Sequence, residues 1–394
     1  MSEFPIHQNR YKSVVAIYSG TKPHPTIAIT HLWKCGAMKR ILITGAGGPA
    51  GINFVASLRI APEKMFLVGT EGNQYFLHLT TTDKKFTVPR AKEPGYVDRL
   101  NEIMKKEKVE FLHAQTDIEI EVISENREKI NAKLLLPSKK AVRVCQDKLE
   151  ATRLWKKRNV PVAKFLELTK EADVDNAFKK LGSSIWIRAT HGAGGKGSTP
   201  AHNPETAKSW INYWKARGTA WKFIAQEHLP GRNMAFHSIW KEGELITSMA
   251  RERIEYIYPH LAPSGITGTP AVQKTVHDDE INERGTEAVL AIDPSFSGIA
   301  CVDLKANQDG VQCVTEINAG RMFTTSFFFS CASKVLRKDY YANIPYLCVK
   351  LACNEKIPRI PKYNVLPKDI YWIRHIDGPA RLVKDSKIIG EMYR

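Results

Sequence analysis

The stretch IWIRATHGAGGKGST, residues 185–199, places an arginine inside an apolar run and then continues into a loop of glycines and small side chains. The apolar run predicts a buried strand, in which the charge of Arg188 requires a partner. The loop exposes consecutive backbone N–H groups, which can fold over phosphate groups. We therefore expect Arg188 and the loop to bind a nucleotide triphosphate. A buried carboxylate is the alternative partner for the arginine, and an unstructured turn is the alternative for the loop.

The preceding residues QDKLEATRLWKKRNVP, 146–161, predict a helix that brings a second cation to this site. Asp147 is the expected N-cap, and Glu150 follows it at the spacing of a capping box. Lys148 then lies in the first turn, where unpaired N–H groups and the helix dipole favour anions. Lys148 and Arg188 are thus the two cations that we expect to bind phosphate.

Acidic side chains gather in CVDLKANQDGVQCVTEINAGR, residues 301–321, which predicts two strands joined by a turn. Alternate residues of a strand face one side, so Glu316 and Asn318 point together and Asp303 can join them from the neighbouring strand. Three oxygen ligands suit Mg²⁺, with Mn²⁺ as the alternative metal. Arg321 follows at once and can neutralise charge on a transferring phosphoryl group. A polar strand end that faces solvent is the alternative interpretation.

A second glycine turn occurs in KRILITGAGGPAGINFVASLRI, residues 39–60, between a predicted strand and a predicted helix. It fits the pattern GxGxxA from Gly45, and Glu71 ends the next strand where a ribose acceptor would lie. Dinucleotide binding and a simple tight turn both remain open for it. Strands and helices continue to alternate over 38–145, which predicts a parallel α/β unit.

The second half of the chain has a different organisation, because strand-like runs separated by loops dominate it from residue 146 onward. This pattern predicts an α+β region. The proline-rich segment 356–369 predicts an irregular C-terminal wrap. Residues 1–37 contain one acid and several bases, and Met38 directly precedes the first predicted strand. We expect 1–37 to be an extension, or translation to begin at Met38.

Composition limits the class of protein. Of the 394 residues 43% are hydrophobic and 25% are charged, as in ordinary globular proteins, and no apolar run approaches the ~18 residues of a membrane span. The seven cysteines form no CxxC pair, which predicts reduced thiols and a cytoplasmic location. The net charge of +17 favours anionic partners. We interpret the basic stretch 133–158 as a solvated helix face rather than a nucleic-acid site.

Six motifs, taken in order, carry a resemblance to a known family: QDKLEATRLWKKRNVP (146–161), IWIRATHGAGGKG (185–197), AQEHLPG (225–231), RERIEYI (251–257), PSGITGT (263–269) and VTEINAGR (314–321). The series resembles the ATP-grasp superfamily, most of all the synthetase component of carbamoyl-phosphate synthase and its single-module relatives, over roughly residues 38–330. The implied fold is α/β plus α+β, with a Rossmann-like pre-ATP-grasp domain that binds no dinucleotide, followed by a two-lobed ATP-grasp domain. The implied divisions are the extension 1–37, the first domain 38–145, the ATP-grasp domain 146–350 with lobes of about 146–225 and 226–350, and the C-terminal wrap 351–394.

The resemblance also implies roles for single residues. Arg188 and Arg321 are the implied catalytic residues. The residues implied to bind ATP lie at the helix start, in the strand, in the glycine loop and in the hinge: Lys148, Arg188, His191, Gly192, Gly194, Gly195, Lys196, Gly197, Gln226, Glu227, His228, Leu229 and Asn233. The implied metal ligands are Asp303, Glu316 and Asn318.

Substrate contacts are expected in two loops. PSGITGT lies where the family has an active-site loop, so Ser264 and Gly265 are candidates to contact substrate or phosphate. In TDIE, residues 116–119, Asp117 and Glu119 follow a predicted strand and are candidates to hold an amine, with a solvated turn as the alternative.

The chain departs from the family pattern at three points. Asn233 stands where the family has a ribose-binding glutamate, which puts the ribose contact in doubt. The family's NPR motif appears as NAGR, so that Arg321 comes one place later. One module is present where a carbamoyl-phosphate synthase large chain has two.

The implied activity is that of an ATP-dependent ligase. A carboxylate, with bicarbonate among the candidates, would accept the γ-phosphate to give an acyl phosphate, and an amine or ammonia would displace the phosphate. A narrower alternative is ammonia-dependent formation of carbamoyl phosphate, by a homodimer in place of the two fused modules. Two alternatives from other classes are a nucleic-acid-binding protein and a nucleotide-binding regulator without turnover. The expected partners are small molecules and neither membrane nor nucleic acid.

Overall fold

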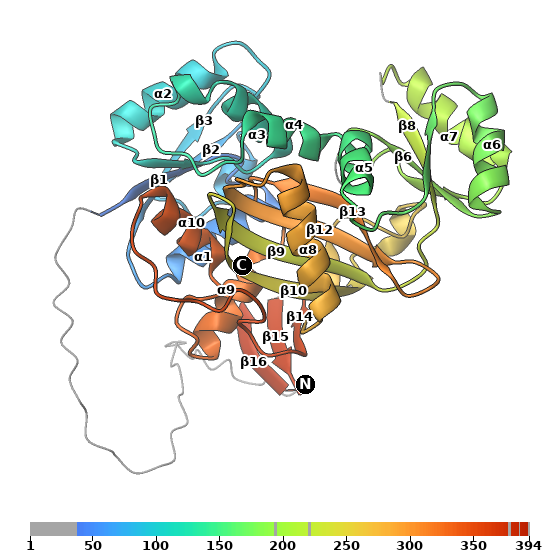
Figure 1. Ribbon diagram of the computed structural model, residues 1–394. Helices are drawn as coiled ribbons and strands as arrows, with labels where there is room; N and C mark the ends of the chain where they lie inside the picture. Colours follow the sequence, from blue (N-terminus) through green and yellow to red (C-terminus); the bar gives the residue numbers. More distant parts are fainter. Residues whose placement is uncertain (1–37, 193–194, 220–221, 377–379, 386, 393–394) are drawn as a thin grey trace, which may run out of the picture. The chain divides into compact units, whose positions relative to one another are not determined.

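A parallel sheet forms the first part of the computed structural model, which describes residues 38–192, 195–219, 222–376, 380–385 and 387–392. Its strand order is β3-β2-β1-β4 (Figure 1). The strands are β1 Arg40–Ile43, β2 Phe66–Glu71, β3 Lys84–Thr87 and β4 Phe111–His113. The α-helices around them are α1 Pro49–Arg59, α2 Tyr96–Glu107, α3 Asp117–Glu125 and α4 Lys139–Gln146, with 3₁₀ turns at Phe76–His78 and Arg127–Lys129. The predicted Rossmann-like α/β unit is confirmed.

The parallel sheet is buried on both faces, because successive residues of β1 point to opposite sides. Ile41 and Ile43 belong to the same buried cluster as Phe54 of α1. Leu42 belongs to another cluster, together with Leu100 of α2. This two-sided burial explains why the strand sequence is continuously apolar.

The glycine turn after β1 is tight. Gly45 has a φ of 54°, in the left-handed region that favours glycine. A Cβ on Gly51 would lie 2.3 Å from the carbonyl oxygen of Gly45, so a larger residue cannot replace it without movement. Glu71, the candidate ribose acceptor, instead accepts a hydrogen bond of 3.1 Å from the N–H of Gly47. The contacts therefore favour the interpretation as a simple turn.

An eight-stranded antiparallel sheet forms the centre of the second half, in the order β13-β12-β9-β10-β11-β14-β15-β16. Its strands are β9 Asn233–Lys241, β10 Glu244–Tyr256, β11 Pro270–Val276, β12 Gly298–Ala306, β13 Gln312–Ala319, β14 Ile370–Ile373, β15 Ala380–Lys384 and β16 Lys387–Met392. Helices α5 (Lys148–Lys157) and α8 (Asp279–Ile292) cover one face, where the buried Trp155 donates a hydrogen bond of 2.9 Å to the Ala288 carbonyl. The other face carries the site described below.

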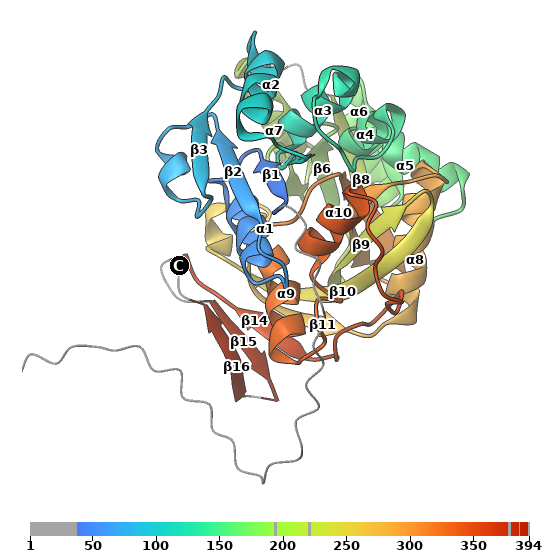
Figure 2. The same ribbon diagram turned by 90° about the vertical axis from the view of Figure 1, so that its left-hand side faces the viewer.

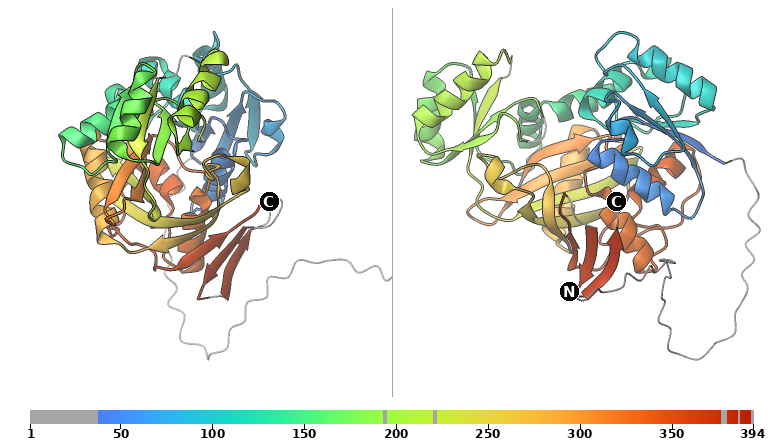
Figure 3. Two further views of the ribbon diagram at one scale, coloured as in Figure 1. Left: turned by 90° about the vertical axis from the view of Figure 1, so that its right-hand side faces the viewer. Right: turned by 180° about the vertical axis from the view of Figure 1, so that it is seen from behind.

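A smaller antiparallel sheet has the order β5-β8-β6-β7. Its strands are β5 Phe165–Leu168, β6 Ile185–Ala189, β7 Thr199–Ala201 and β8 Phe223–Glu227, and its helices are α6 Ala172–Leu181 and α7 Pro204–Ala216. Both helices pack on one face of the sheet (Figure 3). Ile185, Ile187 and Ala189 point toward them, so the alternate residues Trp186 and Arg188 point to the opposite face.

The C-terminal part contains more regular structure than an irregular wrap. Helices α9 (Ser326–Val335) and α10 (Ile344–Ala352) pack against α1, as Figure 2 shows. Strands β14 to β16 then extend the large sheet. Ile370 and Trp372 are alternate residues of β14, so both point to the same face, and both are buried. The residues between α10 and β14 lack strands and helices, as expected for 356–369.

Met38–Arg394 form one compact unit, and the expected extension 1–37 lies outside the described residues. A third 3₁₀ turn covers Pro259–Leu261. Among the helices of the described segments, none has both the length and the apolar character that a membrane crossing requires.

Candidate active site

A pocket opens between the face of the small sheet that carries Arg188 and the face of the large sheet that is opposite α5 and α8. Most of the residues predicted from the sequence line it: Lys148, Arg188, Gly192, Gly195, Lys196, Gln226, Glu227, His228, Leu229, Asn233, Ser264, Asp303, Glu316, Asn318 and Arg321. Motifs that lie far apart in the chain therefore meet in one place.

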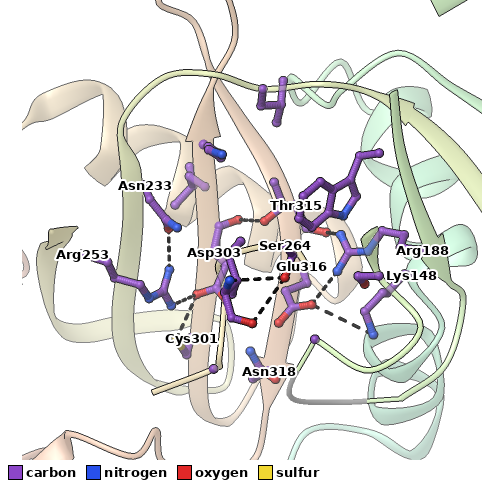
Figure 4. A pocket seen from close by; sticks show the side chains of 18 of the residues that line it. Lys148, Arg188, Asn233, Arg253, Ser264, Cys301, Asp303, Thr315, Glu316 and Asn318 are labelled. Carbon is purple, nitrogen blue, oxygen red and sulfur yellow. Dashed lines mark hydrogen bonds and ion pairs between the residues drawn. The ribbon is translucent and has the colours of Figure 1, made fainter. Parts of the chain in front are cut away.

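Arg188 reaches across the pocket to the large sheet (Figure 4). Its side chain is buried, and one terminal nitrogen donates to Glu316 Oε2 at 2.7 Å while the other donates to the Thr315 carbonyl at 3.0 Å. Its Nε–H has no acceptor among the described residues. The buried carboxylate that the sequence left open as a partner is thus Glu316.

Lys148 approaches the same carboxylate from the start of α5. Asp147 caps this helix, because its side chain accepts the N–H groups of Leu149 and Glu150 at 2.9 and 3.2 Å. The Nζ of Lys148 lies 4.0 Å from Glu316 Oε2 and donates to the Gly192 carbonyl at 2.6 Å. Burial lowers the pKa of Lys148, and Glu316 opposes that effect.

The cations around Glu316 keep it ionised. Burial alone would raise the pKa of this carboxyl, but Lys148, Arg188 and Arg321 lower it to about 2. Glu316 therefore carries a negative charge at any physiological pH.

Asp303 on β12 lies directly opposite Glu316 on β13, because these residues are partners in the strand register. Arg253 on β10 donates to Asp303 Oδ1 at 2.5 Å and to the Asn233 side chain at 2.9 Å (Figure 4). Burial raises the pKa of Asp303; Glu316 adds to this rise, and Arg253 opposes it. The pair of facing carboxylates is thus stabilised by arginines from two sides.

The expected metal ligands offer suitable donors. Within the described residues, hydrogen bonds and ion pairs occupy Oε2 of Glu316 and Oδ1 of Asp303, and they leave the second oxygen of each carboxylate without a partner. Asn318 adds an amide oxygen next to Glu316 on the same face of β13. Carboxylate and amide oxygens suit Mg²⁺, which usually binds one or two carboxylates together with substrate phosphates. In the described part of the chain, no group of three or more acidic, histidine or cysteine side chains has an arrangement that could hold a metal ion by itself.

Arg321 joins the first part of the chain to this site. It donates to Asn318 Oδ1 and to Asp117 Oδ1, each at 2.5 Å. Burial would lower the pKa of Arg321, but Asp117 raises it. Asp117, which begins α3, thus holds this arginine at the edge of the pocket, although it does not itself line the pocket.

The glycine loop lies opposite the expected substrate loop. A Cβ on Gly195 would come within 3.1 Å of the Ile266 carbonyl, and Gly195 has a φ of 75°. Ser264 Oγ accepts the N–H of Ile266 at 3.2 Å and so orders the second loop. Gly194, predicted to bind ATP, lies outside the described residues.

The hinge segment contributes part of the wall. Gln226 on β8 is buried beside Trp186, its partner in the strand register. Glu227 is held by the N–H of Lys164, which donates to its carboxylate at 2.8 Å. Asn233 donates to the Tyr256 hydroxyl at 2.9 Å, so the residue that replaces the family's glutamate is ordered and lines the pocket.

Four predicted residues besides Asp117 and Gly194 do not line the pocket: Glu119, His191, Gly197 and Gly265. Glu119 has a structural role, since it forms a capping box with Thr116 at the start of α3 and accepts the Tyr96 hydroxyl at 3.1 Å. The spacing Thr-x-x-Glu in residues 116–119 is the sequence signal for that role. His191 lies 3.7 Å from Asp147.

Several lining residues were not predicted, among them Arg251, Arg253, Tyr256, Cys301, Lys305 and Phe323. On β12 Lys305 and Asp303 are separated by the apolar Leu304, whereas on β10 Arg251 and Arg253 are separated by the charged Glu252. Alternation of charge with apolar residues is a signal for one polar strand face, but it does not distinguish a pocket from solvent.

Comparisons with known proteins agree with this architecture. A family model described as "PylC-like, N-terminal domain" matches residues 41–135. The carbamoyl phosphate synthase large chain of Clostridium acetobutylicum is 20% identical over 237 residues, which are 57% of this chain and 22% of that protein. The chain thus spans less than a quarter of the length of this relative.

Solved structures are similar over most of the chain. Carboxyaminoimidazole ribonucleotide synthase from Aspergillus clavatus, complexed with ATP, has a TM-score of 0.64 at 15% identity and covers 85% of this chain and 81% of its own. The chain has the ATP-grasp fold. The same fold is found in the biotin carboxylase domain of Hydrogenobacter thermophilus 2-oxoglutarate carboxylase, in complex with MgADP, ADP and bicarbonate, with a TM-score of 0.63, 14% identity and coverage of 85% and 73%.

A third similar structure is the L-amino acid ligase from Bacillus licheniformis, with a TM-score of 0.62, 13% identity and coverage of 88% and 82%. The resemblance to ATP-grasp proteins seen in the sequence motifs is confirmed.

Proposed function

We propose that this ATP-grasp protein is an ATP-dependent carboxylate–amine ligase. The observation that carries the proposal is the meeting of Lys148 and Arg188 with Asp303 and Glu316 in one pocket. Arg188 from the small sheet and Lys148 from the start of α5 would bind the phosphates, and oxygens from the large sheet would bind the metal. The similar structures complexed with ATP and with MgADP support this assignment.

The charge of the pocket favours a polyanionic ligand. Seven lysines and arginines line it, against three acids. The cations are Lys148, Arg188, Lys196, Arg251, Arg253, Lys305 and Arg321, and the acids are Glu227, Asp303 and Glu316. A triphosphate with its metal and an anionic substrate would balance this excess, whereas a neutral ligand would leave it uncompensated.

The reaction would proceed in two steps. An oxygen of the substrate carboxylate attacks the γ-phosphorus, the bond to the bridging oxygen breaks, and ADP leaves, which gives an acyl phosphate. The nitrogen of an amine or ammonia then attacks the acyl carbon, inorganic phosphate leaves, and the nitrogen loses a proton. Closure of the glycine loop would exclude the water that otherwise hydrolyses the acyl phosphate.

The residues have separate tasks in this scheme. Lys148 and Arg188 bind and orient the phosphates, and Arg321, held by Asp117, neutralises charge on the transferred group. Asp303, Glu316 and Asn318 would hold Mg²⁺, which supplies charge stabilisation to the phosphoryl oxygens when it is bound. The pocket would need no covalent nucleophile from the protein.

Phosphate release from ATP, measured across a panel of carboxylates and amines, tests this function. We expect release that requires both Mg²⁺ and a carboxylate, and a coupled product with the correct amine. Release that no carboxylate stimulates would contradict the assignment, and nucleotide binding without turnover would indicate a regulator.

A second candidate is the formation of carbamoyl phosphate from bicarbonate, ammonia and ATP. The similarity to the carbamoyl phosphate synthase large chain favours it, although this chain spans only 22% of that protein. The panel should therefore include bicarbonate with ammonia, and carbamoyl phosphate should be trapped as product. The homodimer that would replace two fused modules, and the cytoplasmic location, stay predictions.

A further inference from the structure

Arg251 on β10 is an arginine of the pocket that the proposed reaction does not use. Its side chain lines the pocket, and the residue is 2% exposed. Its Nε donates to His237 Nε2 at 2.7 Å and one terminal nitrogen donates to Thr325 Oγ1 at 3.0 Å. The guanidinium carbon lies 5.0 Å from the ring centre of Phe323. None of these contacts carries a negative charge to balance the arginine.

His237 does not supply that charge, because it is neutral. Burial, together with Arg251 and Arg253, lowers the pKa of His237 well below its ordinary value. Its Nε2 accepts a hydrogen bond from the Nε–H of Arg251, so its Nδ1 carries the ring hydrogen, and the Nδ1–H group has no acceptor among the described residues. Gln273 Nε2 is a further buried donor without an acceptor in the described part of the chain.

The surroundings of Arg251 therefore contain more hydrogen-bond donors than acceptors. Thr325, which accepts from Arg251, also contacts Gln273 Oε1 at 3.4 Å, so the local acceptors are already in use. A ligand that only accepts hydrogen bonds, such as a carboxylate, would correct this imbalance.

The nearest arginine on the same strand has a different arrangement. Arg253 is also largely shielded from solvent, with 10% of its side chain exposed, but its charge is matched by Asp303 at 2.5 Å. The two positions on β10 thus differ in their contacts: Arg253 contacts a carboxylate of the protein, whereas Arg251 contacts none among the described residues and Asp303 acts on it only from a greater distance. A buried guanidinium without a counter-ion is costly, which makes this position suited to an anion from the ligand.

An anion bound at Arg251 would lie at a distance from the carboxylate that reacts beside Asp303 and Glu316. In the strand register Arg251 pairs with Ala235 on β9, and Ala235 pairs with Asp303 on β12. The backbones of Arg251 and Asp303 are therefore two strand spacings apart, or about 10 Å. A substrate that has its reacting carboxylate beside Asp303 and Glu316 could place a second anionic group at Arg251.

We propose that Arg251 binds a carboxylate of an organic substrate that is not the group phosphorylated, so that the substrates include an amino acid or a dicarboxylic acid. This inference rests on the proposed function and narrows it. Bicarbonate and ammonia contain no second carboxylate and would leave Arg251 without a counter-ion.

Titration calorimetry on the full chain tests the proposal, with Mg²⁺ and the non-hydrolysable analogue AMP-PNP present. The probes are L-alanine, L-glutamate and succinate. Their controls are L-alaninamide, L-glutamine and acetate, each of which has one carboxylate fewer than its probe. We expect the wild type to bind at least one of the three probes more tightly than its control. In Arg251→Met that affinity should fall by about tenfold or more, as expected for the loss of a charge-assisted pair.

Three further measurements separate this role from a structural one. Arg251→Lys, which keeps the charge but loses the fork of donors, should restore part of the affinity. The affinity for MgADP should stay within about twofold of wild type in Arg251→Met, since Arg251 is not assigned to the phosphates. The exposed Arg143, which pairs with Glu125 on the surface, provides the control Arg143→Met, and this variant should bind all probes as the wild type does.

The outcomes show separately whether the inference about Arg251 or the proposed function is wrong. If the wild type binds MgADP but none of the three probes, or if Arg251→Met binds them with wild-type affinity, the inference about Arg251 is wrong and the proposed function survives. If the wild type fails to bind MgADP, the proposed function is wrong and the inference falls with it. A lower melting temperature of Arg251→Met with unchanged probe affinity would show that Arg251 has a structural role.

Discussion

Arg188 on β6 donates a hydrogen bond of 2.7 Å to Glu316 on β13, so that a cation of the small sheet and a carboxylate of the large sheet neutralise each other. Both residues are assigned to the triphosphate and its metal in the proposed function. Nucleotide binding would therefore replace this ion pair by two new ones, one from Arg188 to phosphate and one from Glu316 to Mg²⁺. After this exchange Arg188 and Glu316 would each still contact a group of opposite charge.

Glu316→Gln should abolish ATP cleavage, because it removes one of the two carboxylates expected to hold the metal. We expect a decrease of about 100-fold or more in phosphate release, with the fold retained because the amide has the same shape. Phosphate release and the melting temperature are to be measured together. The exposed Glu125 on α3 gives the control Glu125→Gln, which should cleave ATP at the wild-type rate. Turnover by Glu316→Gln close to that of wild type would remove the proposed metal site.

Arg188→Ala should weaken the binding of nucleotide. The loss of a charge-assisted contact to phosphate should raise the dissociation constant of MgADP by about 10- to 100-fold, which calorimetry measures. Arg153, which pairs with Glu167 at the surface, provides the control Arg153→Ala with unchanged affinity. Equal affinity of Arg188→Ala and wild type would show that the arginine serves only the ion pair with Glu316.

Acid stability provides a test of the cations around Glu316. Its folded-state pKa is lowered to about 2, despite burial, by Lys148, Arg188 and Arg321. A lowered pKa stabilises the fold above the unfolded value of about 4.3, and this contribution is lost as the pH falls toward 2. The difference in unfolding free energy between wild type and Glu316→Gln should therefore be constant from pH 7 to about 5. Below pH 5 this difference in unfolding free energy should decrease, by roughly 1–3 kcal/mol in total.

Urea unfolding of both proteins between pH 3 and 7 measures this difference. If the difference in unfolding free energy between the two proteins stays constant down to pH 3, Glu316 is not held ionised by these cations. The control Glu125→Gln should show a much smaller dependence, since Glu125 lies at the surface.

Removal of residues 1–37 should cost little activity. Every described residue of the site belongs to the compact unit Met38–Arg394. A chain that begins at Met38 should release phosphate at a rate within about twofold of the full chain, with a similar melting temperature. An inactive truncation would show that 1–37 contribute to the enzyme.

The sequence predicted the helix and the strand that position Lys148 and Arg188, because the signals for these elements are local. Asp147 caps α5 as its spacing with Glu150 indicates, and the apolar residues on either side of Arg188 define a strand with the arginine on one face. Asp303 and Glu316 could also be paired from the sequence, since they lie on consecutive strands joined by a turn.

The other contacts of the site join distant parts of the chain, and local sequence signals do not predict them. The pairing of Arg253 with Asp303 requires β9 to lie between β10 and β12, and no local pattern specifies that strand order. The contact of Asp117 with Arg321 joins residues that are 204 positions apart. The role of Glu119 was open to prediction from the capping-box spacing with Thr116, but a solvated turn after the strand also explains those residues.

A crystal structure of the full chain with AMP-PNP and Mg²⁺ tests the central claim most directly. We expect the triphosphate between Lys148 and Arg188 and the metal on oxygens of Asp303 and Glu316. The hydrogen bond between Arg188 and Glu316 should be exchanged for contacts with the ligand. A nucleotide bound elsewhere, or an intact Arg188–Glu316 pair beside a bound nucleotide, would contradict it.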